Sequence, residues 1–581
     1  MIPFVRKMVR GLALALAIGL LAFGMVSDTL PRPQGDTSPP DDSRWLISLG
    51  LAFILLMIYA ILSVSGDPSQ RGATPEERFR ANVRQLGGFL LVGFTLLSLH
   101  LLREQIVAAS VIKGATVITE SGEVVQDPRK IPEQLRIRRG AIYAGDRIVA
   151  RSEVIPPSTY AHRVYPEPNI SYLAGYYNPT VYGSAGLEAA FDSYLSGRQV
   201  LDPLLEQQRL LLNQPPIGSD LYLTIDPELQ DVAQAELGER KGAVVLLDAQ
   251  TGAILALASW PHIEPQQLSF DPYVEDWPTE NRRVIDYYNG VVSDESAPLI
   301  MRATQGLYPP GSTFKTVSAG GALDTGAAKP TSIFTDTNGT IQVEPGGYVH
   351  RDCSTCRPDR HGPRFTLTEG YKWSLNVVFA ELALQLGPTR LMEYSRRFGF
   401  GTRYELGVPV DVSTIASDTA RLEGSKNLLA ATAYGQGEVQ ATPLQMALVA
   451  ATVAHGGELP APYLVSSIRD PQTGATAWQF QPHNLGRVLS PSANSDLKAM
   501  MEESIKTGWA NAAGIPGATV GGKTGTAETG RGTAHSWFIG WAGKDANNPQ
   551  YAIAAIIEEG GEGTRVSLPL AREVLVAALK R

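Results

Sequence analysis

Three long apolar runs dominate the first hundred residues. They cover residues 11–26, 45–65 and 85–102, contain no Asp, Glu, Lys or Arg, and the third is interrupted only by His100. Because about 20 apolar residues span a bilayer as an α-helix, the second run is long enough and the first is slightly short. We therefore expect a membrane region with about three transmembrane helices over residues 1–105.

The charges that flank these runs predict their orientation. Basic residues gather before the first run and between the second and third, at Arg6, Lys7, Arg10, Arg71, Arg78, Arg80 and Arg84, whereas the proline-rich segment 27–44 is mainly acidic. Since basic flanks stay on the cytoplasmic side, we expect a multi-pass protein of the cell membrane whose chain after about residue 105 lies on the outer (extracytoplasmic) face. A cleavable signal peptide is the alternative interpretation of the first run, and it also leaves the rest outside.

Residues 106–220 combine short strand patterns with polar turns. Strands are predicted at 115–119, 141–143 and 147–150. We expect a small, mostly β, extracytoplasmic pedestal domain here, with no site of its own.

From residue 221 to 581, strands and long helices are mixed. Helical spacing occurs at 314–325, 374–386, 427–434, 442–455 and 491–505, and strand patterns occur at 221–225, 242–258, 519–524, 535–542 and 551–559. The order of strands, then helices, then strands predicts an α+β domain, in which a sheet has its helices on one side and a helical lobe is inserted between its strands.

Composition narrows the class of protein. The chain has 581 residues, 44% hydrophobic and 19% charged, which excludes a disordered or fibrous protein. Its net charge of −8 and its lack of long basic runs speak against nucleic acid as a partner. Two cysteines are too few for a disulfide framework.

A serine and a lysine three residues apart, Ser312 and Lys315, follow a Pro-Pro-Gly turn at the start of a predicted helix. Residues three apart on a helix are neighbours, so the Lys315 amine can reach the Ser312 hydroxyl and act as its base. The same Ser-x-x-Lys spacing recurs at 110–113 and 495–498. The pattern therefore gains weight only from other motifs downstream.

Ser374 and Asn376 form a second motif, Ser-Leu-Asn, at the start of the strongly apolar helix predicted over 374–386. Polar groups buried at such a position need partners. The spacing recurs at 425–427 and 492–494, and a plain serine cap with a surface asparagine is the alternative interpretation.

A third motif, Lys523-Thr524-Gly525, lies in a strand pattern with further glycines at 521 and 522. Glycine within a strand indicates that something approaches the backbone closely, and we expect a substrate peptide along this strand edge. A second Lys-Thr-Gly at 506–508 follows the helix predicted over 491–505, where lysine and glycine are ordinary end signals.

The three motifs in this order are those of penicillin-binding proteins and serine β-lactamases. The chain resembles the class B penicillin-binding proteins, which are membrane-anchored peptidoglycan D,D-transpeptidases, from about residue 136 to the end. Further similar stretches are 186–188, 223–226, 242–245, 435–437, 442–447 and 535–540. The resemblance implies an antiparallel sheet flanked by helices with a helical lobe, over residues 221–581. The extra apolar runs differ from the family's usual single anchor.

The resemblance also implies roles for the motif residues. Ser312 would attack the carbonyl of a D-Ala-D-Ala stem peptide, with Lys315 as base and the N–H groups of Ser312 and Thr526 holding the oxyanion. Ser374 would relay a proton, Asn376 would bind the substrate backbone, and β-lactams would acylate Ser312 as covalent inhibitors. The residues expected to bind the terminal carboxylate and line its site are Lys523, Thr524, Gly525 and Thr526.

The family's usual partner is a polytopic glycan polymerase of the shape, elongation, division and sporulation family, which we expect to contact the pedestal and the third span. Two other functions share the motifs: a serine β-lactamase or β-lactam sensor, for which no deacylating base is found, and a catalytically silent cell-wall scaffold.

The two cysteines, Cys353 and Cys356, lie between His350 and His361. This spacing allows a structural zinc site of two cysteines and two histidines, whereas a local disulfide or free thiols are the alternatives outside the membrane. No cofactor is otherwise expected.

Overall fold

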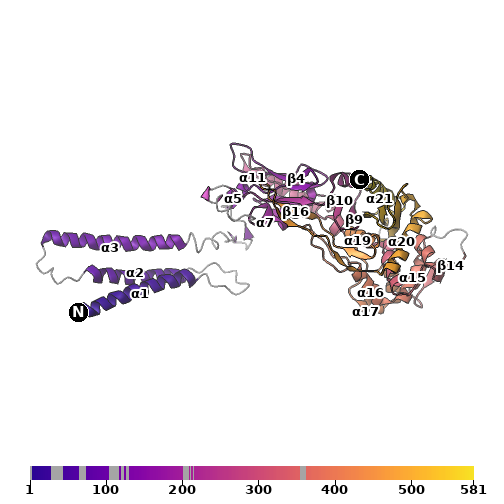
Figure 1. Ribbon diagram of the computed structural model, residues 1–581, viewed down its shortest axis with the longest axis horizontal. Helices are drawn as coiled ribbons and strands as arrows, with labels where there is room; N and C mark the ends of the chain where they lie inside the picture. Colours follow the sequence, from indigo (N-terminus) through magenta and orange to yellow (C-terminus); the bar gives the residue numbers. More distant parts are fainter. Residues whose placement is uncertain are drawn as a thin grey trace. The chain divides into compact units, whose positions relative to one another are not determined.

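The computed structural model divides the chain into two compact units, Met1–Pro128 and Arg129–Arg581 (Figure 1). The described residues are 3–27, 43–64, 74–103, 117–118, 124–125, 130–199, 209, 211–212, 215–353, 362–530 and 532–581. Of the strand predicted at 115–119, only β1 (Val117–Ile118) is described, paired with β2 (Val124–Val125).

The first unit contains three long helices, α1 (Pro3–Ser27), α2 (Ser43–Val64) and α3 (Pro75–Leu102). Each contains a segment long and apolar enough to cross a membrane: Lys7–Gly24, Arg44–Leu62 and Pro75–Leu102. The three predicted spans are therefore confirmed as helices, and this part of the chain suits a membrane anchor.

Polar side chains on these helices find partners between helices. The indole nitrogen of Trp45 on α2 lies 2.9 Å from Nδ1 of His100 on α3, and the guanidinium of Arg103 lies 5.1 Å from the Trp45 ring centroid. Gly24 lets α1 approach α2, since a Cβ there would meet Trp45 and Ser48 at 2.9 Å. His100, which interrupts the third apolar run, is thus a packing residue.

The second unit begins with a six-stranded sheet in the order β17-β16-β8-β3-β4-β5. The strands are β3 (Ile142–Ala144), β4 (Arg147–Glu153), β5 (His162–Val164), β8 (Asp220–Leu223), β16 (Val465–Arg469) and β17 (Thr476–Gln479). Only the β3–β8 pair is parallel. Because β16 and β17, which follow the predicted boundary near residue 220 by more than 200 residues, pair in the same sheet as β3, β4 and β5, that boundary lies inside a sheet.

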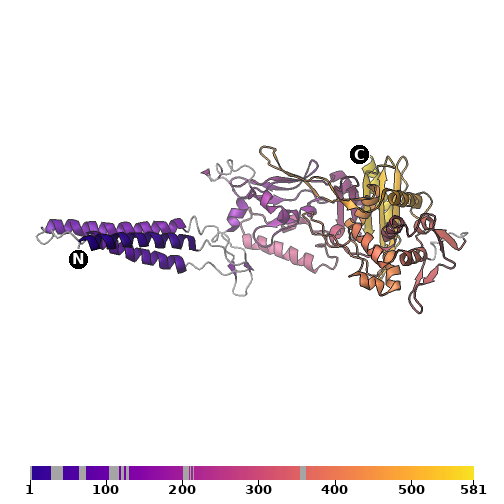
Figure 2. The same ribbon diagram turned by 60° about the horizontal axis from the view of Figure 1, so that its bottom comes forward.

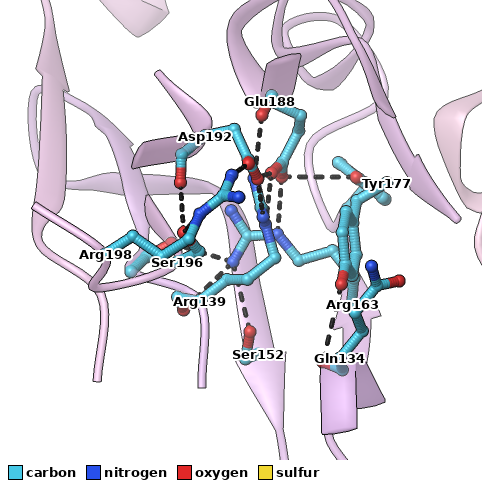
Figure 3. Close-up of polar contacts among 11 residues, drawn as sticks. Gln134, Arg139, Ser152, Arg163, Tyr177, Glu188, Asp192, Ser196 and Arg198 are labelled. Atoms are coloured by element: carbon cyan, nitrogen blue, oxygen red, sulfur yellow. Dashed lines mark hydrogen bonds and ion pairs between the residues drawn. The ribbon is translucent and has the colours of Figure 1, made fainter. Parts of the chain in front are cut away.

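A buried ion-pair network holds the pedestal together (Figure 3). Glu188 is fully buried between two guanidiniums, with Arg139 at 2.8 Å and Arg163 at 2.6 Å. Although burial alone would raise it, these two charges hold the pKa of Glu188 below its usual value. Asp192 accepts from Arg139 at 2.5 Å and also pairs with Arg198 at the exposed rim.

The second sheet has five antiparallel strands in the order β10-β9-β21-β20-β19. They are β9 (Gly242–Asp248), β10 (Ile254–Trp260), β19 (Thr519–Ala527), β20 (His535–Gly543) and β21 (Tyr551–Ile557). Figure 2 shows them side by side, the C-terminal ones in yellow. The strands predicted at 519–524, 535–542 and 551–559 are confirmed, and β19 forms an edge of the sheet.

Helices cover both faces of this sheet, so the prediction of helices on one side is wrong. Val245 of β9 packs into the core shared with α19 (Pro443–Ala454), whereas Val244 packs with α9 (Pro227–Leu237) and α21 (Ser567–Leu579). The physical reason is the continuous apolar run of β9, which is typical of a strand buried on both faces.

The helical lobe lies between β10 and β19 in the chain. Its longer helices are α13 (Lys315–Asp324), α15 (Asn376–Leu386), α16 (Pro388–Arg397), α18 (Lys426–Ala433), α19 and α20 (Pro491–Lys506). The five predicted helices are present, and each of their boundaries lies within two residues of its predicted position. Among the described helices of ten or more residues that follow β10, three were not predicted: α11 (Trp277–Ser293), α16 and α21.

The remaining elements are short. They are α5 (Ile131–Arg136), η4 (Ser171–Ala174), β6 (Tyr176–Asn178), β7 (Gly183–Ala185), α6 (Leu187–Ala190), α7 (Asp192–Leu195), α10 (Pro265–Leu268), α12 (Arg302–Gln305), η5 (Gly311–Phe314), β11 (Ile333–Thr335), β12 (Thr340–Gln342), β13 (Val349–Arg351), β14 (Arg364–Thr366), α14 (Leu367–Lys372), α17 (Thr419–Glu423), β15 (Glu458–Pro460), β18 (Asn484–Arg487) and η6 (Asn511–Ala513).

The pedestal network predicts a large stability difference between two charge removals. Glu188→Gln leaves the buried Arg163 without a carboxylate and Arg139 with Asp192 alone, so we expect a loss of about 3–5 kcal/mol in the free energy of unfolding. Arg198→Gln removes a pair whose arginine is 66% exposed, and should cost less than about 1 kcal/mol. Urea unfolding followed by tryptophan fluorescence measures both. Equal losses of unfolding free energy in the two variants would contradict the assignment of Glu188 as the buried centre of the network.

Candidate active site

Ser312 lies in the short 3₁₀ turn η5, directly before α13. The turn is held from two sides: the Trp537 indole donates to the Pro309 carbonyl at 3.0 Å, and the Gly311 N–H donates to the Gly435 carbonyl at 2.9 Å. Gly311 has φ of 54°, a conformation that favours glycine. The predicted turn and helix start are present, although the first turn is 3₁₀ rather than α-helical.

The Lys315 side chain is fully buried and points to the second motif. Its Nζ donates to the Ser374 carbonyl at 2.6 Å and to the Asn376 Oδ1 at 2.8 Å, and it lies 3.3 Å from the Ser374 Oγ. The Lys315 backbone N–H donates to the Ser312 carbonyl, but no side-chain hydrogen bond among the described residues joins the Lys315 amine to the Ser312 hydroxyl. The amine is hydrogen-bonded to Ser374 and Asn376 instead.

Ser374 connects α14 to α15 in a conformation that side chains rarely adopt, with φ of 61°. This turn presents its hydroxyl to both lysines of the site. Asn376 begins α15, as predicted, and its Nδ2 donates to the Arg351 carbonyl at 2.7 Å. Backbone strain of this kind persists only where surrounding contacts hold it in place.

Lys523 completes the arrangement from the edge strand β19. Its Nζ donates to the Ser374 Oγ at 2.8 Å and to the Thr524 carbonyl at 3.0 Å, and its side chain is 1% exposed. The structure thus brings the three predicted motifs together, with the Ser374 hydroxyl between two buried lysine amines.

Burial lowers the pKa values of both lysines. Burial, with the neighbouring Lys523 ammonium, lowers the pKa of Lys315 well below the usual lysine range, against the opposing effect of Asp352. Burial lowers the pKa of Lys523 to about 7. A neutral amine at Lys315 near neutral pH is therefore favoured by its surroundings, which is the form that accepts a proton.

Protein atoms occupy the positions where side chains of two β19 glycines would lie. A Cβ on Gly521 would meet the Trp541 ring at 2.3 Å, and one on Gly525 would meet the Pro310 carbonyl at 3.0 Å. Because side chains point to the faces of a sheet, these contacts do not concern the strand edge, where the substrate peptide stays a prediction. Gly525 also lets the turn before Ser312 dock against the strand.

An open cavity of about 880 Å³ lies in front of the motifs. Among the residues that line it are Ser312, Ser374, Asn376, Thr524 and Thr526. Lys315 and Lys523 lie buried behind this lining. The cavity therefore exposes the hydroxyl and amide groups of the site to a substrate while the two amines stay shielded from water.

The repeated motifs lie elsewhere or have structural roles. Ser495 and Lys498 lie within α20, and Lys506 ends that helix, as predicted, in an ion pair with Glu502 at 3.0 Å. Ser425 caps α18. The copy at 110–113 lies outside the described residues.

Zinc, a local disulfide or free thiols were the alternatives for the cysteine segment. Cys353 is disulfide-bonded, and both ring nitrogens of His350 are hydrogen-bonded within the protein, Nδ1 to the Tyr434 hydroxyl at 2.7 Å and Nε2 to the Asn427 amide oxygen at 3.2 Å. These two candidates are thus engaged elsewhere. Cys356 and His361 lie outside the described residues, and no metal-binding group of three side chains occurs within the described ones.

Asp352 is a residue of the site that the motifs did not predict. Its Oδ1 accepts from the Val377 N–H at 3.0 Å, so it caps α15 from a loop 25 residues earlier in the chain. Burial raises the pKa of Asp352 to about 7, and its contact with the Asp336 carboxyl acts in the same direction. No pattern of neighbouring residues in the sequence predicts such a long-range cap.

Known proteins match both parts of the second unit. Residues 242–576 match the penicillin binding protein transpeptidase domain, and residues 139–221 match the penicillin binding protein A dimerisation domain. The chain is 31% identical over 475 residues to the peptidoglycan D,D-transpeptidase PbpA of Mycolicibacterium smegmatis, which covers 78% of this chain and 92% of that protein. The PbpA of Mycobacterium tuberculosis is also 31% identical, over 478 residues, with the same shares of 78% and 92%.

Solved structures of penicillin-binding proteins are also similar to this chain. The imipenem acyl-enzyme complex of penicillin-binding protein A from M. tuberculosis has a TM-score of 0.69 at 30% identity, over 77% of this chain and 99% of that one. The chain therefore belongs to the penicillin-binding protein transpeptidase family and is a class B penicillin-binding protein. The resemblance and the fold class predicted from the motifs are confirmed.

The docking of the Ser312 turn on β19 can be tested at one glycine. A Cβ at Gly311 would lie 2.9 Å from the Thr526 carbonyl oxygen, so Gly311→Ala should displace Ser312 and slow acylation by a fluorescent penicillin about 100-fold. Gly326 also has a positive φ, 71°, but open space around its Cβ position. Gly326→Ala should carry a similar backbone cost, about 1–2 kcal/mol, yet acylate normally. Equal acylation by both variants would contradict the docking.

Proposed function

We propose that this protein cross-links peptidoglycan as a serine D,D-transpeptidase that acts on D-Ala-D-Ala stem peptides and is acylated by β-lactams. The observation that carries the proposal is the Ser374 hydroxyl, 2.8 Å from Lys523 Nζ and 3.3 Å from Lys315 Nζ, behind a cavity that exposes Ser312. Relatives named peptidoglycan D,D-transpeptidase and the β-lactam acyl-enzymes of a homologue support it.

The first step forms an acyl-enzyme. A neutral Lys315 takes the proton of the Ser312 hydroxyl as Oγ attacks the carbonyl carbon of the penultimate D-Ala. This requires the amine to turn toward Ser312 from its hydrogen bonds with Ser374 and Asn376, and catalytic hydrogen bonds commonly tighten when substrate binds. The N–H groups of Ser312 and Thr526 would receive the oxyanion, a pair typically worth several kcal/mol of the barrier.

Collapse of the intermediate then releases the terminal D-Ala. Its C–N bond breaks, and the leaving nitrogen needs the proton that Lys315 holds. Ser374 lies within reach of both lysines, so its hydroxyl would pass the proton toward the leaving group. Asn376 holds Lys315 through its Oδ1, which adds a positioning role to the substrate contact that the resemblance implies.

The edge strand β19 would bind the peptide. An unpaired strand edge is suited to an added extended chain, and Thr524 and Thr526 line the cavity along it. The terminal carboxylate would lie near Lys523, and its negative charge would favour the protonated form of that amine.

In the second step an amine of another stem peptide attacks the Ser312 ester. The new amide forms the cross-link, and the Ser312 oxygen leaves and recovers a proton through Lys315. This resolution by an amine distinguishes a transpeptidase from a β-lactamase, which needs water and a base to drive it.

Acylation by a fluorescent penicillin separates the three candidate functions. We expect stable labelling of the full chain that is lost in Ser312→Ala, because the ester oxygen is then missing. Rapid loss of label by hydrolysis would favour a β-lactamase instead. No labelling of the wild-type chain would favour a silent scaffold.

The membrane region supports a further part of the proposal. The basic residues before and between its helices favour a multi-pass protein whose catalytic unit would lie on the outer face, and the pedestal with the third helix would contact a polytopic glycan polymerase of the shape, elongation, division and sporulation family. Cross-linking in cells followed by detergent extraction tests this pairing. Recovery of the protein without such a polymerase would count against it.

A further inference from the structure

The binding mode proposed above gives the donor peptide a direction along β19. Its terminal carboxylate lies near Lys523 and its scissile carbonyl near Ser312 and Thr526. The peptide therefore runs opposite to the strand, and its earlier residues extend beyond Ala527, where β19 ends. One extended residue spans about 3.3 Å, so the residue before the two D-Ala units reaches the position just past the strand end.

Glu528 occupies that position. Side chains on an extended chain alternate between faces, and Thr524, Thr526 and Glu528 all line the same cavity. Glu528 therefore continues the row of side chains that the peptide would follow.

The cavity lining includes one arginine, Arg351, and no ion pair joins it to Glu528 among the described residues. Tyr434 and Gln436 also line the cavity, and the Glu528 charge contributes, after burial and Tyr348, to raising the pKa of Tyr434. The carboxylate is thus close to the cavity interior.

Glu528 is also free to bind a ligand. Among the described residues it has no ion-pair partner, whereas the second carboxylate at this end of the cavity, Glu562, is held by Arg565 at 2.8 Å. A cationic group of the substrate would therefore meet Glu528 rather than Glu562.

We propose that Glu528 is a specificity-determining residue that binds the side-chain ammonium of the diamino acid preceding D-Ala-D-Ala in the donor peptide. This inference rests on the proposed function. It names the chemical class of the donor's third residue: a side chain with a positive charge at its end. An anionic or acylated side chain at that position is bound less well, because the carboxylate then faces a like charge or no charge.

Three penicillins that differ in the charge of the side chain test this inference. The acyl side chain of a penicillin corresponds to the peptide before D-Ala-D-Ala. We measure second-order acylation rates of the detergent-solubilised full chain with benzylpenicillin (neutral), ampicillin (ammonium) and carbenicillin (carboxylate). In Glu528→Gln we expect the ampicillin rate to fall about 3- to 10-fold, the carbenicillin rate to rise by a similar factor, and the benzylpenicillin rate to stay unchanged, as for a single partly exposed ion pair.

Two matched variants and a salt series sharpen the test. Glu239→Gln removes the same charge at an exposed position away from the cavity and should leave the ampicillin-to-carbenicillin ratio unchanged. Added salt should reduce that ratio in the wild type but not in Glu528→Gln. A ratio that responds to Glu562→Gln and not to Glu528→Gln would overturn the assignment.

The natural donor gives a second measurement. Cross-linking of peptides with lysine before D-Ala-D-Ala should exceed that of peptides with Nε-acetyl-lysine, and Glu528→Gln should abolish the difference. Normal acylation with a ratio independent of Glu528 would overturn this inference alone. Failure of all three penicillins to acylate the wild type would overturn the proposed function and this inference together.

Discussion

The burial of two lysine amines against one serine hydroxyl is the constraint on which the site depends. A charged amine loses its hydration when buried, and two such charges repel one another, so the protein favours neutral lysine. Lys315 and Lys523 are 0% and 1% exposed, and each lies within hydrogen-bonding distance of Ser374. Because burial lowers the pKa of Lys315, its neutral amine can accept a proton from Ser312 near neutral pH.

Each element that holds this pair comes from a different part of the fold. The edge strand β19 supplies Lys523, and the turn before Ser312 docks on that strand because Gly525 leaves room for it. A strained turn at Ser374 lies between two helices, and the loop after β13 fixes the second helix through Asp352. Movement of any one of them would separate the hydroxyl from its lysines.

The motifs predicted the site residues because residue type and spacing can be recognised within a short stretch of sequence. The contacts that position these residues join distant parts of the chain. Ser312, Ser374 and Lys523 were identified by residue type, spacing and the elements around them. Helical spacing predicts that the Lys315 amine can reach Ser312, whereas its present hydrogen bonds to Ser374 and Asn376 depend on the fold, which brings these residues close. Asp352 carries no local pattern that links it to Val377.

For the fold, the sequence likewise predicted the individual elements better than their contacts across the chain. Apolar runs and turn residues revealed the membrane helices and most elements of the catalytic domain. Two features needed knowledge of pairing across the chain: the return of β16 to the pedestal strand β8, and the burial of both sheet faces. The continuous apolar run of β9 indicates that both faces of the sheet are buried. No local pattern in the sequence indicates that β16 pairs with β8.

The pH dependence of acylation tests the central claim most directly. If neutral Lys315 is the base, the rate of acylation by benzylpenicillin rises as pH increases through the lowered pKa of Lys315 and is close to its maximum at neutral pH. Lys523→Met removes the neighbouring positive charge while keeping a side chain of similar length, so the pKa of Lys315 should increase and the rising limb should move to higher pH. A rising limb at the same pH in both proteins, or a rate that does not change with pH, would contradict the account.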